Sequence, residues 1–210
     1  MINIYNKDCL EAMKSMKDNQ FDLAIVDPPY GIKSKISSGA GMMRKYVDKT
    51  KKINWDNNLP SSKYFIELFR VSKNQIIWGG NYFLDYLKST SCFVVWDKQN
   101  GTNNMADCEL AWTSFKSSVR MYRGHIFKGI GCTNYKPIHP TQKPVKLYEW
   151  LLMNYAKVGD KILDTHLGSG SIAIACHNLG YDLEGYELDK EYYDNALKRI
   201  KQHQSQLRLI

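Results

Sequence analysis

The residues best suited to chemistry are Asp-Pro-Pro-Tyr at positions 27–30, which follow a largely apolar run at 21–26. Such a run predicts a buried parallel strand, and ligands bind at the edge of a sheet where parallel strands end. The exocyclic amine of adenine or cytosine is a poor nucleophile because its lone pair is delocalised into the ring. Asp27 could accept one N–H of such an amine and a backbone carbonyl the other, while the prolines fix both acceptors and Tyr30 stacks on the base. We therefore predict a catalytic loop here, although a Pro-Pro turn with Asp27 as its cap would also fit.

A second candidate site lies near the other end of the sequence. A predicted short strand at 161–164 leads into a loop with two glycines, Gly168 and Gly170, and then into a helix rich in small apolar residues. Glycine lets the backbone approach a ligand closely, and this pattern is typical of nucleotide binding. A further predicted strand, 181–186, ends at Glu187, about 20 residues after the loop, where an acid can bond ribose hydroxyls. The glycines and the acid together predict a nucleotide-binding site.

Lys143 is a third candidate, because it stands just before a predicted helix at 145–155. A lysine beside a helix start can meet an anionic group that the helix end also attracts. A carboxylate ligand is the natural candidate.

The elements that must position these residues alternate between strands and helices. Predicted strands lie at 2–5, 21–26, 75–78, 92–96, 109–113, 161–164 and 181–186, and predicted helices at 10–16, 61–71, 82–87, 145–155, 171 onward and 189–201. The strands at 92–96 and 109–113 are expected to form a hairpin. Periodicity is lost at about 31–60, which predicts a long loop, and the stretch 119–138 is expected to be irregular. At 210 residues, the pattern predicts one α/β domain over 1–210.

Basic residues suggest a polyanionic partner. The net charge is +8, and much of the excess lies in the predicted loop after the catalytic tetrapeptide. The residues predicted to contact nucleic acid are Lys33, Lys35, Arg44, Lys45, Lys49, Lys51, Lys52, Arg120 and Arg123. A solvated insertion, and ordinary packing around the two arginines of the 119–138 stretch, remain alternatives.

The cysteines and the apolar pattern bear on compartment and metal binding. The five cysteines are odd in number and lack Cys-x-x-Cys spacing, which argues against a disulfide framework and a zinc site, so we expect no metal. The first residues do not resemble a signal peptide, and no segment approaches the length of a membrane span. We expect a cytoplasmic protein.

Three motifs together resemble those of the S-adenosylmethionine-dependent DNA amino-methyltransferases: Asp-Pro-Pro-Tyr at 27–30, His-Pro-Thr-Gln-Lys-Pro at 139–144, and Asp-Thr-His-Leu-Gly-Ser-Gly-Ser at 164–171. Their order is similar to that of the β group, in which the catalytic motif precedes the cofactor loop. The resemblance covers nearly the whole chain. It implies a Rossmann-like, circularly permuted class I methyltransferase fold, with a mostly parallel seven-stranded sheet and one antiparallel strand. The strands that end at the two loops would be neighbours.

The resemblance also implies roles for individual residues. Lys143 would meet the methionyl carboxylate of the cofactor, Glu187 would hold its ribose, and Asp8 would face its adenine amino group. The implied catalytic residues are Asp27, Pro28, Pro29 and Tyr30, and the implied cofactor-binding residues are Asp8, Cys9, Lys143, Asp164, His166, Gly168, Ser169, Gly170, Glu187 and Leu188.

The chain departs from the family pattern in two places. The family usually has Pro-Phe where this chain has Thr165-His166, so packing around the cofactor is expected to differ. His166 could be a general base, but we interpret it as a substituted wall residue. Only about residues 116–138 are available as a target-recognition region, which is short for the family. This predicts short sequence recognition, recognition by the basic loop, or a partner that supplies specificity.

The resemblance predicts transfer of a methyl group from S-adenosylmethionine to N6 of adenine in DNA, without a metal or a covalent enzyme intermediate. Cytosine N4 is the nearest alternative, although members that act there more often carry serine in place of Asp27. Adenine in RNA, a non-catalytic nucleic-acid-binding subunit and, less well supported, a dinucleotide oxidoreductase are further alternatives. We also expect a homodimer, as in related enzymes, and a possible restriction-modification partner, an endonuclease.

Overall fold

An eight-stranded sheet organises the structure, a computed structural model that describes residues 1–32, 59–100, 106–125, 138–139 and 141–206. The strands are β1 (Ile2–Asn6), β2 (Phe21–Val26), β3 (Ser72–Trp78), β4 (Phe93–Asp97), β5 (Cys108–Thr113), β6 (Arg120–Arg123), β7 (Lys161–Asp164) and β8 (Asp182–Glu187). The helices are α1 (Cys9–Met13), α2 (Ser62–Val71), the 3₁₀ helix η3 (Gly80–Tyr82), α3 (Val145–Tyr155), α4 (Ser171–Leu179) and α5 (Lys190–Gln204).

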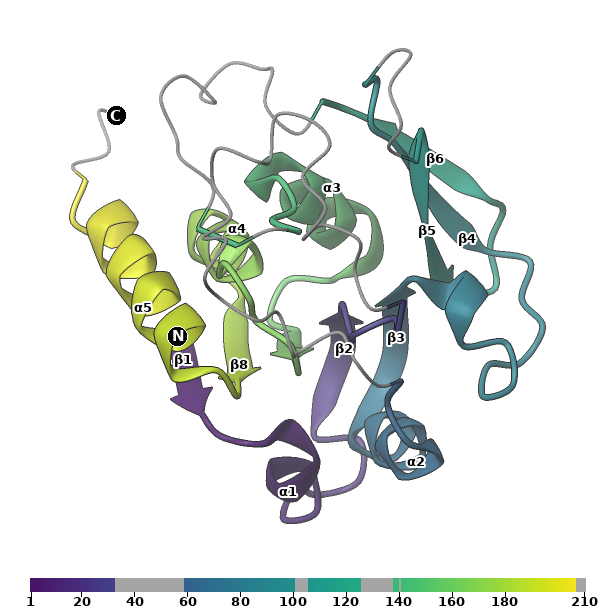
Figure 1. Cartoon of the computed structure of the whole chain (residues 1–210), viewed down its shortest axis with the longest axis horizontal. Coiled ribbons are helices and arrows are strands. Elements are labelled where there is room, and N and C mark those ends of the chain that lie inside the picture. Colours follow the sequence, from purple (N-terminus) through teal and green to yellow (C-terminus); the bar gives the residue numbers. More distant parts are fainter. Residues whose placement is uncertain (33–58, 101–105, 126–137, 140, 207–210) are drawn as a thin grey trace.

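The strand order is β1-β8-β7-β2-β3-β5-β4-β6. All neighbouring strands pair in parallel except where β5 meets β3 and β4, so β5 is the single reversed strand of this sheet. β1 and β8 lie at one end of the sheet beside α5, and β4, β5 and β6 form the other end (Figure 1). This confirms the mostly parallel α/β sheet with one antiparallel strand.

Alternating side chains of the central strands build a core on each face of the sheet. On β2, Leu23 and Ile25 join a cluster with residues of α3, α4 and α5, whereas Ala24 and Val26 join a cluster with residues of α1 and α2. A strand buried on both faces must be apolar at nearly every position, which is the pattern that the sequence has at 21–26.

Local capping explains where two of the helices begin. The side chain of Asp8 accepts a hydrogen bond from the backbone N–H of Glu11 at the start of α1, and that of Asp189 accepts from Glu191 and Tyr192 at the start of α5. Both aspartates follow a strand, so each strand-to-helix turn lies at the carboxyl edge of the sheet.

Two expectations about secondary structure were wrong. The predicted helix at 82–87 is a 3₁₀ turn over Gly80–Tyr82 followed by turns. Gly79 has a φ of +68°, and most of the bonds that follow span three residues, as from Tyr82 N to Gly79 O. The stretch expected to be irregular contains β6, an eighth strand that pairs with β4. Its side chains are mostly exposed, so the apolar alternation that marks a strand is missing.

The predicted hairpin is confirmed, since β4 and β5 pair antiparallel from Phe93↔Trp112 to Asp97↔Cys108. The predicted basic loop at 31–60 lies almost entirely outside the described residues. Among the helices that the structure does describe, none is long and apolar enough to cross a membrane.

Candidate active site

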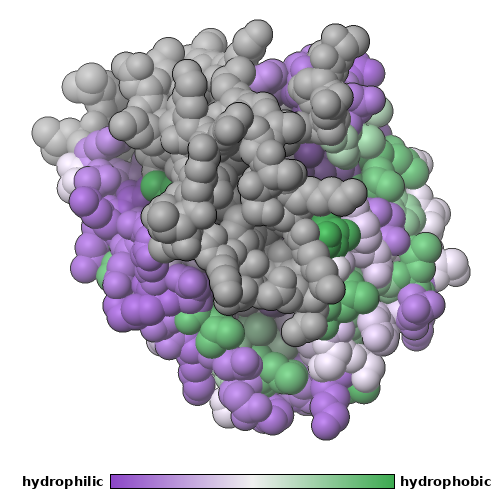
Figure 2. All heavy atoms as spheres, in the orientation of Figure 1, coloured by the Kyte–Doolittle hydropathy of each residue, from purple (hydrophilic) through white to green (hydrophobic). Residues whose placement is uncertain are grey.

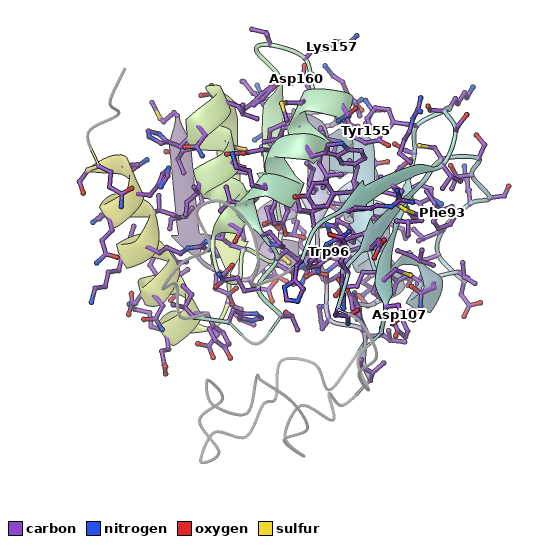
Figure 3. The ribbon with its side chains drawn as sticks, turned by 90° about the horizontal axis from the view of Figure 1, so that it is seen from above. Phe93, Trp96, Asp107, Tyr155, Lys157 and Asp160 are labelled. Carbon is purple, nitrogen blue, oxygen red and sulfur yellow. The ribbon has the colours of Figure 1, made fainter. Side chains whose placement is uncertain are left out.

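The two loops identified in the sequence leave neighbouring strands. β2 and β7 pair in parallel, with Leu23 opposite Ile162 and Ala24 opposite Leu163. Asp27 follows the end of β2 and Asp164 ends β7, so both carboxylates lie at the carboxyl edge of the sheet. Figure 3 shows the opposite directions of these strands. Lys157 and Asp160, which precede β7, lie on one side of the ribbon, and Asp107, which precedes the reversed strand β5, lies on the other. The two candidate sites therefore belong to one edge.

The Asp27 carboxylate is held at both oxygens. The hydroxyl of Tyr30 donates to Asp27 Oδ1 at 2.6 Å, and Lys143 Nζ lies 2.5 Å from Asp27 Oδ2. Burial and the nearby charge of Asp27 raise the pKa of Tyr30 well above its usual value, so the phenol stays protonated and donates. The orientation of Asp27 is thus set before any substrate binds.

The Tyr30 ring packs between aromatic and backbone neighbours. It stacks on Tyr82 with ring centroids 4.9 Å apart and meets Phe83 edge-on at 6.1 Å. A Cβ on Gly79 would lie 2.2 Å from Tyr30 Cε1, so only glycine fits at that position. Stacking of a base on Tyr30, as the sequence predicts, would require a face of this ring that Tyr82 does not cover.

Lys143 links Asp27 to a second carboxylate that sequence reasoning missed. Its side chain is 3% exposed, and Nζ lies 3.1 Å from Glu109 Oε2. Glu109, on β5, also pairs with Lys98 at 2.7 Å. Burial opposes the charged forms, but the opposite charges outweigh it, so the pKa of Lys143 is raised and that of Glu109 is lowered. Asp27, Lys143, Glu109 and Lys98 form a continuous chain of ion pairs, which we call the ion-pair chain.

The expected ligand of Lys143 was a carboxylate, and both carboxylates seen here belong to the protein. An ammonium has three donors. One donates to Asp27, and the contact with Glu109 is an ion pair without hydrogen-bond geometry, so the ammonium keeps donor capacity for a further anionic group. The cation–π contact with Trp78, whose ring centroid lies 5.1 Å from Nζ, fixes the lysine from one more side.

The glycine loop is shaped by left-handed backbone conformations and by Glu187. Gly168 and Gly170 have φ angles of +51° and +71°, which favour glycine. The backbone N–H of Gly168 donates to Glu187 Oε2 at 2.8 Å, while Glu187 Oε1 accepts from the backbone N–H of Asp189 at 2.9 Å. Glu187 therefore joins the glycine loop to the end of β8, and its oxygens keep acceptor capacity for a ligand.

Acidic groups accumulate beside the glycine loop. Asp164 is 3% exposed, and burial, reinforced by the charges of Asp27 and Glu187, raises its pKa to about 8. Burial likewise raises the pKa of Glu187. A cationic ligand would relieve both effects, because an opposite charge favours the ionised carboxylate. The electrostatics around the glycine loop therefore fit a ligand that carries positive charge.

The other residues implied for the cofactor surround the same loop with different exposure. Asp8 is exposed and caps α1, Cys9 is half-buried with its pKa raised to about 12 by burial, and Leu188 is 69% exposed. Ser169 is buried and its hydroxyl lies 3.1 Å from that of Ser171. His166 is half-buried, with Nδ1 bonded to Thr165.

The residues expected to contact nucleic acid are only partly described. Arg120 and Arg123 are exposed on β6, where Arg123 Nε lies 3.6 Å from Asp97 Oδ2. The seven basic residues between positions 33 and 52 lie outside the described residues. On the face seen in Figure 2, hydrophilic side chains dominate near α5, and the opposite side mixes polar and apolar ones.

With this geometry established, comparison with known proteins identifies the family. Residues 88–198 match the profile of N6/N4 methyltransferases, described as DNA methylase. The chain belongs to this DNA methylase family. The motifs and the arrangement of their strands agree with that membership.

Individual members of the family are distant in sequence. The type II methyltransferase M.HpaI of Haemophilus parainfluenzae is 24% identical over 236 residues, which cover 92% of this chain and 72% of that protein. The type II methyltransferase M2.DpnII of Streptococcus pneumoniae is 27% identical over 150 residues, which cover 71% of this chain and 50% of that protein. The chain thus spans only about half the length of M2.DpnII.

Solved structures support the fold. The M1.HpyAVI–SAM complex aligns with a TM-score of 0.63 at 22% identity, covering 95% of this chain and 99% of that one. The cytosine-N4-specific PvuII DNA methyltransferase aligns with the same TM-score of 0.63 at 12% identity, covering 100% of this chain and 88% of that one. The chain therefore has the class I methyltransferase fold that its sequence predicted.

Proposed function

We propose that the chain transfers a methyl group from S-adenosylmethionine to the N6 amino group of adenine in DNA. The observation that carries the proposal is the pairing of β2 with β7, because it puts the Asp27 loop and the glycine loop on neighbouring strands. A methyl donor at one loop and an amine at the other would then be close enough for direct transfer. Membership of the DNA methylase family supports both the reaction and the substrate.

The pocket at the glycine loop is the proposed cofactor site. S-adenosylmethionine supplies a methyl group on a sulfonium, an activated donor that needs no covalent enzyme intermediate. Asp164 and Glu187 supply the negative charge that suits this cationic group, and Gly168 to Gly170 let the backbone approach it. The solved structure of M1.HpyAVI in complex with S-adenosylmethionine supports this choice.

Three further residues have proposed cofactor contacts. The free donor of Lys143 would meet the methionyl carboxylate while its other donors stay on Asp27 and Glu109. Asp8 would bond the adenine amino group, since its cap to Glu11 uses only one carboxylate oxygen. Cys9 and Leu188 would then form part of the wall around the adenosyl group.

Asp27 is the proposed acceptor for the target amine. A carboxylate has about four acceptor positions, so Asp27 can take an N–H in addition to its bonds with Tyr30 and Lys143. The carbonyl of the Asp-Pro-Pro backbone would accept the second N–H and leave the nitrogen lone pair directed at the methyl group. Tyr30 would act chiefly by orienting Asp27.

Replacing Asp27 tests this assignment. Asp27→Ala should lower the rate of methyl transfer by about 10²-fold or more, since a positioned acceptor typically contributes this much. Cofactor affinity, measured by calorimetry, should change little, and the exposed Asp85→Ala serves as a matched control with normal activity. Undiminished methylation by Asp27→Ala would refute the assignment.

Adenine is favoured over cytosine by the aspartate at position 27 of the catalytic motif. Cytosine N4 remains the second candidate, because the fold is shared with the cytosine-N4-specific PvuII enzyme. Mass-spectrometric analysis of nucleosides from DNA and RNA of expressing cells separates N6-methyladenine from N4-methylcytosine and DNA from RNA. Methylated adenine in DNA is the expected result.

Four further proposals accompany the proposed DNA substrate. The basic residues between positions 33 and 52, with Arg120 and Arg123, would contact the phosphate backbone. A cytoplasmic location, a homodimer and a restriction endonuclease partner are proposed as for related enzymes. Light scattering of the purified protein tests the homodimer directly.

A further inference from the structure

His166 occupies a position where this chain departs from its family. It follows Thr165 just after β7, and its backbone N–H donates to Asp164 Oδ1 at 3.0 Å. The related enzymes usually have phenylalanine here, which fills space but offers no hydrogen bond. An imidazole at the same position can donate or accept a hydrogen bond. Its tautomer decides whether it offers a ligand an N–H donor or an acceptor nitrogen.

A relay of hydroxyls reaches the imidazole from α2. Tyr64 Oη lies 2.7 Å from Thr165 Oγ1, and Thr165 Oγ1 lies 2.9 Å from His166 Nδ1. Tyr64 and Thr165 are 3% and 2% exposed, so neither hydroxyl can rely on solvent for a partner. Two hydrogen bonds therefore join the three groups, and it remains to assign the donor and the acceptor in each.

The direction of the relay follows from Tyr64. Among the described residues, Tyr64 forms no hydrogen bond other than that to Thr165. A buried phenol that accepted this bond would have no acceptor for its own proton, which is costly. Tyr64 therefore donates to Thr165, and Thr165 donates to His166 Nδ1. A neutral imidazole whose Nδ1 accepts carries its proton on Nε2.

The imidazole is neutral, and its Nε2 is left for a further partner. Burial lowers the pKa of His166 to about 4, against a smaller opposite effect of Asp8. Nε2 has no hydrogen-bond partner among the described residues, and it is not fully buried. His166 lies two residues before Gly168, so its Nε2–H is a donor beside the glycine loop that no described residue takes up.

We propose that His166 donates a hydrogen bond from Nε2–H to the adenosyl part of the cofactor, in a tautomer that Tyr64 and Thr165 impose. The inference rests on the proposed function, since it concerns the same cofactor site. It makes His166 a specificity-determining residue for the cofactor, and it excludes a role as general base, because Nδ1 is occupied and Nε2 already bears the proton.

The tautomer is tested first, in the free protein. Nitrogen NMR of protein labelled at histidine distinguishes a protonated Nε2 from a protonated Nδ1. The wild type should have the proton on Nε2 of His166, and Thr165→Val, which removes the donor to Nδ1, should give a mixture of both tautomers. A wild-type His166 with its proton on Nδ1 would overturn the inference without any reference to methylation.

The ligand contact is tested by calorimetry with S-adenosylmethionine and with 5′-methylthioadenosine, which keeps the adenosyl part but lacks the amino acid. His166→Phe should bind both about fivefold more weakly, the effect of one neutral hydrogen bond. His166→Gln, whose amide can donate from nearly the place of Nε2, should bind within about twofold of the wild type.

The outcomes separate the two proposals. Equal binding by His166→Phe and the wild type, weakening for S-adenosylmethionine alone, or no rescue by His166→Gln would overturn the inference and leave the proposed function standing. Failure of the wild type to bind S-adenosylmethionine would overturn the proposed function and this contact with it.

Discussion

The buried carboxyl of Asp164 should lose a proton when the cofactor binds. Its pKa is raised to about 8 by burial and by the charges of Asp27 and Glu187. At pH 7 a carboxyl with this pKa is about 90% protonated in the free protein. A cationic cofactor restores the ionised form, because an opposite charge nearby favours it. Binding at pH 7 should therefore release ~0.9 proton.

Calorimetry in buffers of different ionisation enthalpy measures this release. The slope of binding enthalpy against buffer ionisation enthalpy gives the number of protons, which should fall to ~0.1 at pH 9, where Asp164 is already ionised. Asp164→Asn should bind more weakly and release no proton at either pH. A wild-type slope near zero at pH 7 would refute the reasoning, since it would mean that Asp164 is ionised before binding.

The same pKa predicts how stability of the free protein varies with pH. Between about pH 4 and pH 8 the folded state holds a proton on Asp164 that the unfolded state has lost. This contribution to the free energy of unfolding is therefore fully present below about pH 4 and is lost as pH rises through about 8. Urea denaturation across this range should show a steeper decline for the wild type than for Asp164→Asn.

Two further predictions concern groups around the catalytic loop. Glu109→Gln removes a counterion of buried Lys143. Urea denaturation should therefore show that the free energy of unfolding falls by about 2 kcal/mol, and the rate of methyl transfer should fall as well. Unchanged stability would contradict the ion-pair chain. Gly79→Ala places a Cβ 2.2 Å from Tyr30 Cε1, so it should reduce activity strongly. Gly180→Ala is its matched control: φ is +78° but nothing lies within 4 Å, so it should cost about 1 kcal/mol of stability and leave activity intact.

The sequence predicted the site best where a strand ends in a distinctive loop. Asp27 follows the apolar strand β2 and Glu187 ends β8, so their edge of the sheet could be inferred from strand direction alone. That the strands of Asp27 and Asp164 are neighbours came from the resemblance, because pairing between strands so far apart in sequence leaves no periodic signal.

Glu109 and Lys98 could not be found in this way. Glu109 lies on β5 opposite Trp96, and Lys98 lies just beyond the end of β4. Their contact with Lys143 depends on the reversal of β5 and on its place beside β3, neither of which local sequence specifies. A half-buried glutamate with two lysine partners looks in sequence like any charged residue of an exposed strand.

Charge is distributed differently around the Asp27 loop and around the glycine loop. The chain carries a net charge of +8, yet carboxylates gather where the loops meet. Lys143 and Lys98 together balance Asp27 and Glu109, so the place where a base would enter under the proposed function is close to neutral and does not strongly repel a phosphate backbone. At Asp164 burial and the charges of Asp27 and Glu187 outweigh the pull of Lys143, so this carboxyl is mostly protonated at pH 7 in the free protein and ionises when a cation lies beside it. Under the proposed function, the free site therefore presents little uncompensated negative charge to a polyanion, and the bound sulfonium itself restores the negative charge that stabilises it.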